Sequence, residues 1–65
     1  MLSEQQWRIL ALLAQGLPNK AIARQLGIAA STVKNQLTVV FDKLGVSNRT
    51  RAAIAARTLL KNRIP

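Results

Sequence analysis

Apolar residues recur along the chain at the three- and four-residue spacing of helices. In the first such segment, one side is formed by Leu2, Gln6, Ile9, Leu10 and Leu13. Trp7 stands at the rim of this stripe, where we expect it to cover the core. Nowhere do apolar and polar residues alternate over a length that indicates a strand. The pattern predicts four helices, at about 3–15, 18–26, 30–44 and 48–62.

Glycines and capping residues mark where these helices end and begin. Each of the first three is followed by a glycine, the residue that most readily forms a left-handed C-terminal cap: Gly16, Gly27 and Gly45. Residues that cap helix N-termini fall where the first, second and fourth helices should begin: Ser3, Asn19 and Ser47. The connectors that remain have about two to four residues. We therefore predict one all-α domain over residues 1–65.

The other three helices also have an apolar and a polar side. We expect burial of Ile22, Ala23 and Leu26 in the second helix, of Val33, Leu37, Val40, Phe41 and Leu44 in the third, and of Ala52, Ala53, Ala56 and Leu60 in the fourth. The outer side of the second helix carries Lys20 and Arg24. That of the third carries Ser31, Asn35, Thr38 and Asp42, with Lys34 at its edge. The fourth leaves Ile54, Arg57 and Thr58 facing away from the core, with Ala55 beside them.

The composition excludes most chemistry that depends on metals, disulfides or acid–base pairs. The 65 residues include no Cys and no His, and the only carboxylate side chains are Glu4 and Asp42. We therefore expect no metal, cofactor or catalytic site, and the chain is predicted not to be an enzyme. The segment from Ser31 to Lys34 does match the Ser-x-x-Lys motif of penicillin-binding enzymes, but the companion elements of that motif are absent.

The charge indicates an anionic partner. Ten Lys and Arg residues against two Asp and Glu give a formal charge of +8, and five cations follow Lys43 with no acid among them: Arg49, Arg51, Arg57, Lys61 and Arg63. Such a balance is typical of proteins that bind nucleic acid or a membrane surface. The longest uncharged stretch, eleven residues from Ile9 to Asn19, is well short of the roughly 20 that a membrane span needs.

The spacing of three small or apolar residues indicates how the second and third helices meet. Ala23 is small where two helices must approach closely, Gly27 lies in the turn four residues later, and Val33 then packs in the crossing. This spacing is typical of a helix-turn-helix, whose second helix presents its N-terminal half to the DNA major groove. From such a helix, Asn35 can pair with adenine and Lys34 can donate to guanine.

Longer elements resemble one family along nearly the whole chain. They are Ile9-Leu10-Ala11-Leu12-Leu13-Ala14-Gln15-Gly16, Asn19-Lys20-Ala21-Ile22-Ala23, Leu26-Gly27-Ile28, Thr32-Val33-Lys34 and Lys43-Leu44-Gly45-Val46. In this order and without gaps, they resemble the LuxR/FixJ-type (GerE-like) helix-turn-helix DNA-binding domain of bacterial transcription regulators. The resemblance implies a four-helix domain that binds double-stranded DNA in the bacterial cytoplasm, at the nucleoid. RNA polymerase is a further candidate partner, and no membrane partner is expected.

The resemblance also implies roles for single residues. The base-reading positions of the family fall on Lys34, Asn35 and Thr38, and its backbone-contacting positions on Asn19, Lys20, Thr32 and Arg49. The chemistry of neighbouring residues adds Ser31 and Gln36 as base-reading candidates and Arg24 and Arg51 as phosphate contacts. The fourth helix commonly mediates dimerisation in this family, which assigns the dimer interface to Ile54, Ala55, Arg57 and Thr58. Repulsion between the cations of this helix predicts a weak homodimer that DNA strengthens.

Several positions depart from the family pattern. Gln6 stands where a glutamate is usual, and Arg51 stands where a glutamate often opens the fourth helix. Ala29 replaces the usual Ser or Thr cap of the third helix, so that this cap is either missing or moved to Ser31. Gln36 replaces a common histidine and could turn either inward or towards a base. We expect these departures to affect the preferred DNA sequence rather than the fold.

Three other interpretations use the same features. The promoter-reading helix-turn-helix of a sigma factor shares the Ala-x-x-x-Gly turn, but the Lys43–Val46 element and the long fourth helix argue against it. A cationic membrane-surface peptide would gather its charges on one face of an amphipathic helix, whereas these cations are spread over several short helices. The third is a protein-interaction module whose basic surface serves only solubility.

Overall fold

Four α-helices and their connectors make up the computed structural model, which describes residues 1–63. The helices are α1 (Glu4–Ala14), α2 (Asn19–Leu26), α3 (Ala30–Leu44) and α4 (Arg49–Arg63). Each observed end lies within one residue of its prediction, and the all-α fold class is confirmed. Residues 64–65 of the predicted domain lie outside the described part of the chain. None of the four described helices is long and apolar enough to cross a membrane.

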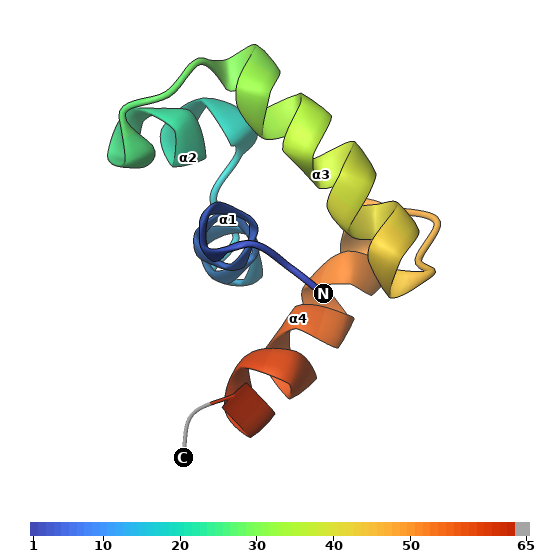
Figure 1. Cartoon of the computed structure of the whole chain (residues 1–65). Helices are drawn as coiled ribbons and strands as arrows, with labels where there is room; N and C mark the ends of the chain where they lie inside the picture. Colours follow the sequence, from blue (N-terminus) through green and yellow to red (C-terminus); the bar gives the residue numbers. More distant parts are fainter. Residues whose placement is uncertain (64–65) are drawn as a thin grey trace.

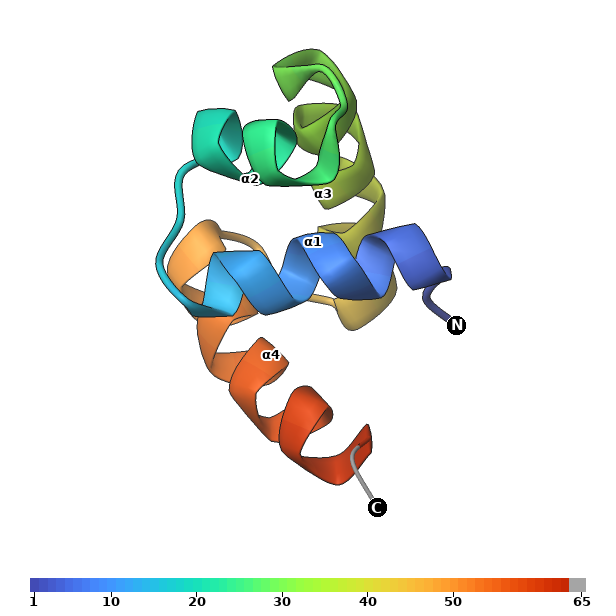
Figure 2. The ribbon, with the colours of Figure 1, turned by 90° about the vertical axis from the view of Figure 1, so that its left-hand side faces the viewer.

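The first helix lies at the centre of the molecule and packs against each of the other three. Figure 1 views α1 nearly end-on, with α2 and the start of α3 above it and α4 below. In the perpendicular view of Figure 2, α2 again lies on one side of α1 and α4 on the other. The central helix therefore connects the helix-turn-helix pair, α2 and α3, to the last helix.

The core is one cluster of apolar side chains to which all four helices contribute. Its largest fully buried members are Ile9, Leu10, Ile22, Val33 and Val40. From α4 only two small side chains, Ala52 and Ala56, are fully buried, which lets the backbone of α4 pack closely on the core. The predicted core is confirmed, and several of its predicted members lie half-buried at the edge: Leu2, Leu26, Phe41, Leu44, Ala53 and Leu60.

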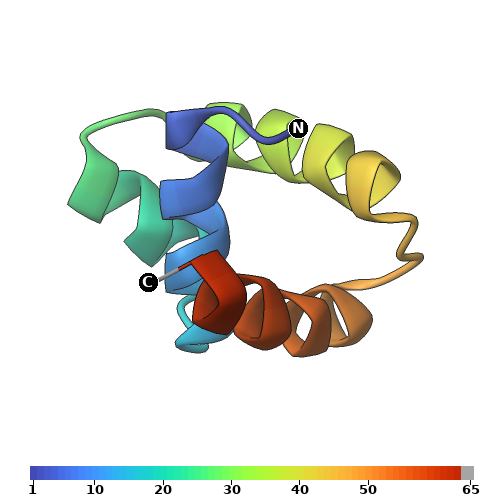
Figure 3. The same ribbon diagram turned by 60° about the horizontal axis from the view of Figure 1, so that its bottom comes forward.

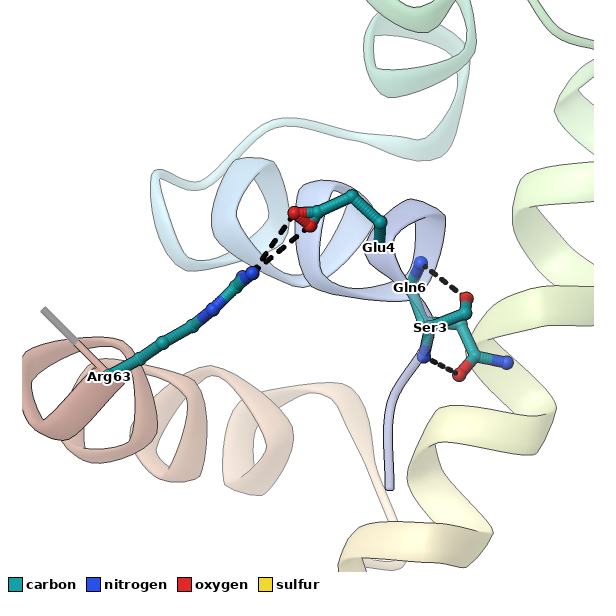
Figure 4. Close-up of polar contacts among 4 residues, drawn as sticks. All are labelled: Ser3, Glu4, Gln6 and Arg63. Atoms are coloured by element: carbon teal, nitrogen blue, oxygen red, sulfur yellow. Dashed lines mark hydrogen bonds and ion pairs between the residues drawn. The ribbon is translucent and has the colours of Figure 1, made fainter.

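The first helix begins with a capping box. Ser3 Oγ accepts a hydrogen bond from the backbone N–H of Gln6 (3.1 Å), and Gln6 Oε1 accepts one from the N–H of Ser3 (2.9 Å). These two bonds satisfy amide groups that the start of a helix leaves without intrahelical partners. Figure 4 shows both bonds at the start of α1. The predicted cap at Ser3 is confirmed, and the reciprocal bond from Gln6 completes it.

Two other predicted caps are wrong. At α2 the cap position is held by Pro18, and Asn19 is already the first residue of the helix. The proline ring restricts φ to a value that suits this extended position, where φ is −72°. At α4 the side chain that caps the helix is that of Asn48 and not Ser47, since Asn48 Oδ1 accepts a hydrogen bond from the Arg51 N–H (2.9 Å). Ser47 and Asn48 are adjacent, and serine and asparagine are about equally preferred at the cap position, so the sequence did not distinguish them.

The turns after α2 and α3 require glycine because of their backbone conformation. Gly27 and Gly45 both have a φ of 68°, in the left-handed region. A Cβ added at either position would meet no atom within 4 Å, so the cost of another residue lies in the dihedral angle and not in a clash. The predicted left-handed caps are confirmed at these two positions. At α1 the cap is Gln15, in a right-handed conformation, and Gly16 follows it with a φ of 90°.

The end of α4 returns to the start of α1. One guanidinium nitrogen of Arg63 lies 3.0 Å from each carboxylate oxygen of Glu4, and the guanidinium carbon lies 4.6 Å from the centre of the Trp7 ring. Figure 3 shows this end of α4, coloured red, beside α1, and Figure 4 shows the ion pair. Trp7 is half-buried against the rim of the core, as predicted. The exposed position of Arg63 and Glu4 keeps the contribution of their ion pair to stability small.

The start of α3 has no side-chain cap, and a substitution there should stabilise the fold. Ala29 holds the cap position in an extended conformation and makes no side-chain bond, so the cap is missing and has not moved to Ser31. The variant Ala29→Ser should raise the free energy of unfolding by about 1 kcal/mol, because its hydroxyl can accept a hydrogen bond from a first-turn N–H. Thermal unfolding followed by circular dichroism should show a rise in Tm of about 4–8 °C.

A matched control places the same hydroxyl one residue further on. Ala30 is exposed and is the first residue of α3. Within the helix serine is a poorer helix former than alanine, so Ala30→Ser should leave Tm unchanged or lower it. A rise in Tm of the same size in both variants would contradict the capping explanation.

Candidate nucleic-acid interface

The outer face of α3 is polar and exposed along its N-terminal half. Val33, Leu37 and Val40 turn into the core, and the opposite side presents four exposed polar residues: Ser31, Lys34, Asn35 and Thr38. Val39 lies one turn beyond Asn35 and is 42% exposed, so this face also carries one apolar side chain. Thr32 is half-buried at the side of the helix. The face thus offers a cation, an amide and hydroxyl groups in about two turns of helix.

The hydroxyl of Thr38 has a defined donor direction. Thr38 Oγ1 donates to the backbone oxygen of Lys34, 3.1 Å away and one turn earlier. Because a hydroxyl has one donor hydrogen and two acceptor lone pairs, this bond leaves Thr38 as a hydrogen-bond acceptor towards the outside. The carboxamide of Asn35 next to it can both donate and accept. The two side chains therefore present different hydrogen-bonding patterns on neighbouring positions of the same face.

The start of α4 is fastened to the start of α2 by Arg49. Arg49 Nη1 donates to Asn19 Oδ1 (2.6 Å) and Nη2 donates to the backbone oxygen of Leu17 (2.6 Å). Figure 2 shows the connector before α2 beside the first turn of α4. Both acceptors are uncharged, so the guanidinium is held in place while its positive charge stays uncompensated. The structure therefore brings together Asn19 and Arg49, which are 30 residues apart in the sequence.

The other predicted phosphate contacts are exposed cations near the same two helix starts. Lys20 and Arg24 lie one turn apart on the exposed side of α2, and Arg51 lies in the first turn of α4. Of the two acids, Glu4 is paired with Arg63 at the far end of α4, and Asp42 lies near the C-terminal end of α3. Positive charge therefore dominates around the beginnings of α2, α3 and α4. Among the described residues, no group of three acidic, His or Cys side chains could hold a metal ion.

Gln36 turns towards α1 rather than away from the molecule. Its Oε1 accepts a hydrogen bond from Gln6 Nε2 (2.9 Å), and Gln6 Oε1 in turn accepts one from Lys43 Nζ (3.2 Å). Lys43 Nζ also donates to the backbone oxygen of Met1 (3.0 Å). We call these three side chains, Gln6, Gln36 and Lys43, the α1–α3 network. The sequence reasoning missed the network, although two of its members are positions that depart together from the family pattern.

The outer face of α4 combines an apolar side chain with a hollow. Ile54 is 63% exposed, Arg57 and Thr58 are exposed, and Ala55 beside them is half-buried. An open hollow of about 410 Å³ lies beside Ile54 and is lined by Gly45, Val46, Ser47, Arg51, Ile54 and Ala55. An exposed apolar residue at the edge of a hollow is suited to contact with another protein surface.

The family of the chain follows from comparison with known proteins. The family of bacterial regulatory proteins described as the luxR family matches residues 1–56, which include all of α1, α2 and α3 and half of α4. The chain belongs to this family. It is therefore a LuxR-type helix-turn-helix domain, the DNA-binding domain of bacterial transcription regulators. The resemblance seen in the sequence is confirmed, and the family is one of regulators rather than enzymes.

Similar proteins include regulators of two kinds. The chain is 42% identical over 64 residues to the DNA-binding transcriptional activator DevR/DosR of Mycobacterium tuberculosis. It is 38% identical over 60 residues to the HTH-type transcriptional regulator MalT of Serratia proteamaculans, and 33% identical over 60 residues to MalT of Vibrio campbellii. These alignments cover 92–98% of the chain, but only 30% of DevR/DosR and 7% of either MalT. The chain thus corresponds to a small part of these longer relatives.

Proposed function

We propose that this chain binds double-stranded DNA in a sequence-specific manner as the DNA-binding part of a bacterial transcription regulator. In this proposal α3 enters the major groove, the starts of α2 and α4 hold the phosphate backbone, and α4 forms the contact between two copies. The observation that carries the proposal is the outer face of α3, where Ser31, Lys34, Asn35 and Thr38 are exposed opposite the buried stripe. RNA polymerase is a further candidate partner for the complete regulator.

The base-reading role is assigned to the N-terminal half of α3. Asn35 can form a bidentate pair with adenine, and Lys34 can donate to guanine. The hydroxyl of Ser31 can donate or accept, whereas that of Thr38, whose hydrogen is bonded to the backbone oxygen of Lys34, can only accept. Asp42 lies about two turns beyond Asn35 on α3. Its negative charge would be repelled by phosphates, so the C-terminal half of α3 is expected to point out of the groove.

The backbone-holding role is assigned to cations and polar groups at the helix starts. Arg49, already held by Asn19 Oδ1 and Leu17 O, needs little ordering to reach a phosphate. The start of α2 has no side-chain cap, so backbone N–H groups of its first turn can donate to a phosphate next to Lys20. Further contacts are assigned to Arg24, Thr32 and Arg51. This combination would fix the orientation of α3 without carrying sequence information itself.

Salt dependence tests whether duplex DNA is the partner. The cations assigned to phosphates are Lys20, Arg24, Lys34, Arg49 and Arg51, which corresponds to about four or five contacts. Each contact should lower the slope of log K against log salt by about 0.9, so we expect a slope near −4 per copy of the chain. Fluorescence anisotropy of a labelled duplex at several salt concentrations would give this slope. A slope near zero would overturn the proposal.

Two substitutions should separate the reading of bases from the holding of phosphates. On the preferred site, selected from a random duplex library, Asn35→Ala should weaken binding by about 1–3 kcal/mol and relax the preference at one base pair, with little effect on random DNA. Arg49→Ala should weaken binding to both kinds of DNA similarly and make the salt slope shallower by about one unit. Anisotropy titrations on both duplexes measure these effects.

Arg8→Ala is the matched control, since Arg8 is an exposed cation on α1, a helix to which no contact with DNA is assigned. It removes the same charge and should change the salt slope less than Arg49→Ala does. Circular dichroism should show unchanged helix content in all three variants, because none of the residues belongs to the core. If Asn35→Ala weakened specific and random duplexes equally, base reading through Asn35 would be excluded.

The pairing of two copies through α4 can be tested at Ile54. Two-fold pairing would match a palindromic site, and the cations of α4 should keep it weak until DNA screens their repulsion. Ile54→Glu should abolish cooperative binding to a two-half-site duplex, because it places a carboxylate on the apolar contact. Binding to an isolated half-site should change much less. Sedimentation velocity with and without DNA reports the number of copies bound.

Gln5→Glu provides the matched control, because it adds the same charge on an exposed position of α1. This variant should retain cooperative binding. The assignment of α4 as the contact would fail if the preferred sites proved to be single half-sites that bind one copy each, and Ile54→Glu bound them as the unchanged chain does.

A further inference from the structure

The α1–α3 network ties the centre of α3 to the first helix through the bond between Gln36 and Gln6. Gln6 is 7% exposed, and it is the only buried polar residue of the described chain. Its amide nitrogen donates to Gln36 Oε1 (2.9 Å), and its amide oxygen accepts from the Ser3 N–H (2.9 Å) and from Lys43 Nζ (3.2 Å). Every polar atom of the Gln6 side chain is thus used. Loss of Gln36 would leave the amide nitrogen of Gln6 poorly hydrated and without a hydrogen bond.

The direction of the bond between the two glutamines is fixed by their neighbours. The Ser3 N–H and the Lys43 ammonium group can only donate, so both must face the oxygen of the Gln6 amide. The nitrogen of that amide then faces the middle of α3, where it requires an acceptor. Gln36 meets this requirement with its carbonyl oxygen. The inward orientation of Gln36 therefore follows from groups on α1 and at the end of α3.

The position of Gln36 on the helix allows this bond to control rotation. Successive residues are about 100° apart around an α-helix, so Gln36 lies at the side of α3, about 100° from Asn35. The apolar residues Val33, Leu37 and Val40 form the inner stripe, and apolar contacts have no strong directional preference. A hydrogen bond at the side of the helix, in contrast, is lost when the helix rolls about its axis.

A small roll is large enough to affect base recognition. Side-chain ends lie roughly 5–6 Å from the helix axis, so a roll of about 10° moves them by about 1 Å. Hydrogen bonds to base edges require donor–acceptor distances of about 2.7–3.2 Å, and a bidentate pair requires two of them at once. A roll of this size would therefore weaken pairing through Asn35 while leaving the contacts of cations with phosphates largely intact.

We propose that Gln6 and Gln36 are positioning residues for base recognition: the hydrogen bond between them sets the roll of α3, and Gln36 does not itself read a base. This inference rests on the proposed function of α3. It assigns a new role to a residue for which base contact was one of two expectations from the sequence. It also extends the recognition machinery to Gln6, on a helix that does not enter the groove.

The test is a double-mutant cycle with variants that keep the side-chain volume. Gln6→Met and Gln36→Met each remove the amide, and the double variant removes both. Affinities for the selected duplex and for random duplex are measured by anisotropy at a temperature where circular dichroism shows every variant folded. Each single variant should lower the ratio of specific to random affinity roughly two- to tenfold, the range expected for one hydrogen bond. The double variant should lower it no further than the single variants.

Two further variants separate positioning from general destabilisation. Gln5→Met makes the same replacement at an exposed neighbour on α1 and should leave the ratio unchanged. Gln6→Glu should largely retain the ratio, because a carboxylate can accept from the Ser3 N–H and Lys43 Nζ, and from the Gln36 amide nitrogen once that amide is reversed. Residual dipolar couplings of the free protein should show a changed orientation of α3 relative to α1 in Gln6→Met but not in Gln5→Met.

The possible results distinguish this inference from the proposed function. If Gln36→Met relaxes the preference at a single base pair while Gln6→Met has no effect, Gln36 reads a base and the inference is overturned. It is equally overturned if the two glutamine variants only lower Tm and leave the affinity ratio and the couplings unchanged. Failure of the proposed function would show in the unmodified chain, as an absence of discrimination between selected and random duplexes, and the inference would fall with it.

Discussion

The structure depends on the packing of one central helix, α1, against the other three. A chain of 65 residues without cysteine or histidine has no covalent or metal cross-link, so its stability must come from the apolar cluster around Ile9, Leu10 and Leu13. The helix-turn-helix pair contributes Ile22, Val33 and Val40 to this cluster, and α4 contributes small alanines. Because α2, α3 and α4 are all anchored on α1, their positions relative to one another depend on it. The surface proposed to meet DNA is formed by α2, α3 and α4, and all three of these helices pack on α1.

Directional polar contacts join helices that the apolar core alone holds without a fixed orientation. Arg49 joins the starts of α2 and α4 through two uncharged acceptors, which fixes the guanidinium without consuming its charge. Gln6 joins α1 to α3 in the same way, since its neutral amide connects the first helix to Gln36 and Lys43. Ion pairing plays little part, since the Glu4 pair with Arg63 is exposed and lies away from the outer face of α3. The positive potential of the molecule is therefore available to an external partner.

The features that could be predicted from the sequence are those that depend on local spacing. Periodic apolar residues defined the four helices to within one residue at each end, and the turns at Gly27 and Gly45 were predictable because few residues adopt a positive φ. The caps at Asn19 and Ser47 were predicted wrongly because neighbouring residues occupied the cap position. The bond from Gln6 to Gln36 joins residues 30 apart, and no periodic pattern specifies such a partner. The bond depends on the Ser3 N–H and Lys43 Nζ, which orient the Gln6 amide, and these groups come together only in the folded chain.

The contact of Arg63 with Glu4 and Trp7 has a topological consequence. It places the first turn of α1 next to the last turn of α4, so the path of the four helices is nearly a closed ring. In a ring the order of covalent connection matters less than the set of packed neighbours. New ends opened at the exposed Ser47, with a linker between the ends of the described chain, would interrupt none of the four helices. The architecture is thus compatible with circular permutation.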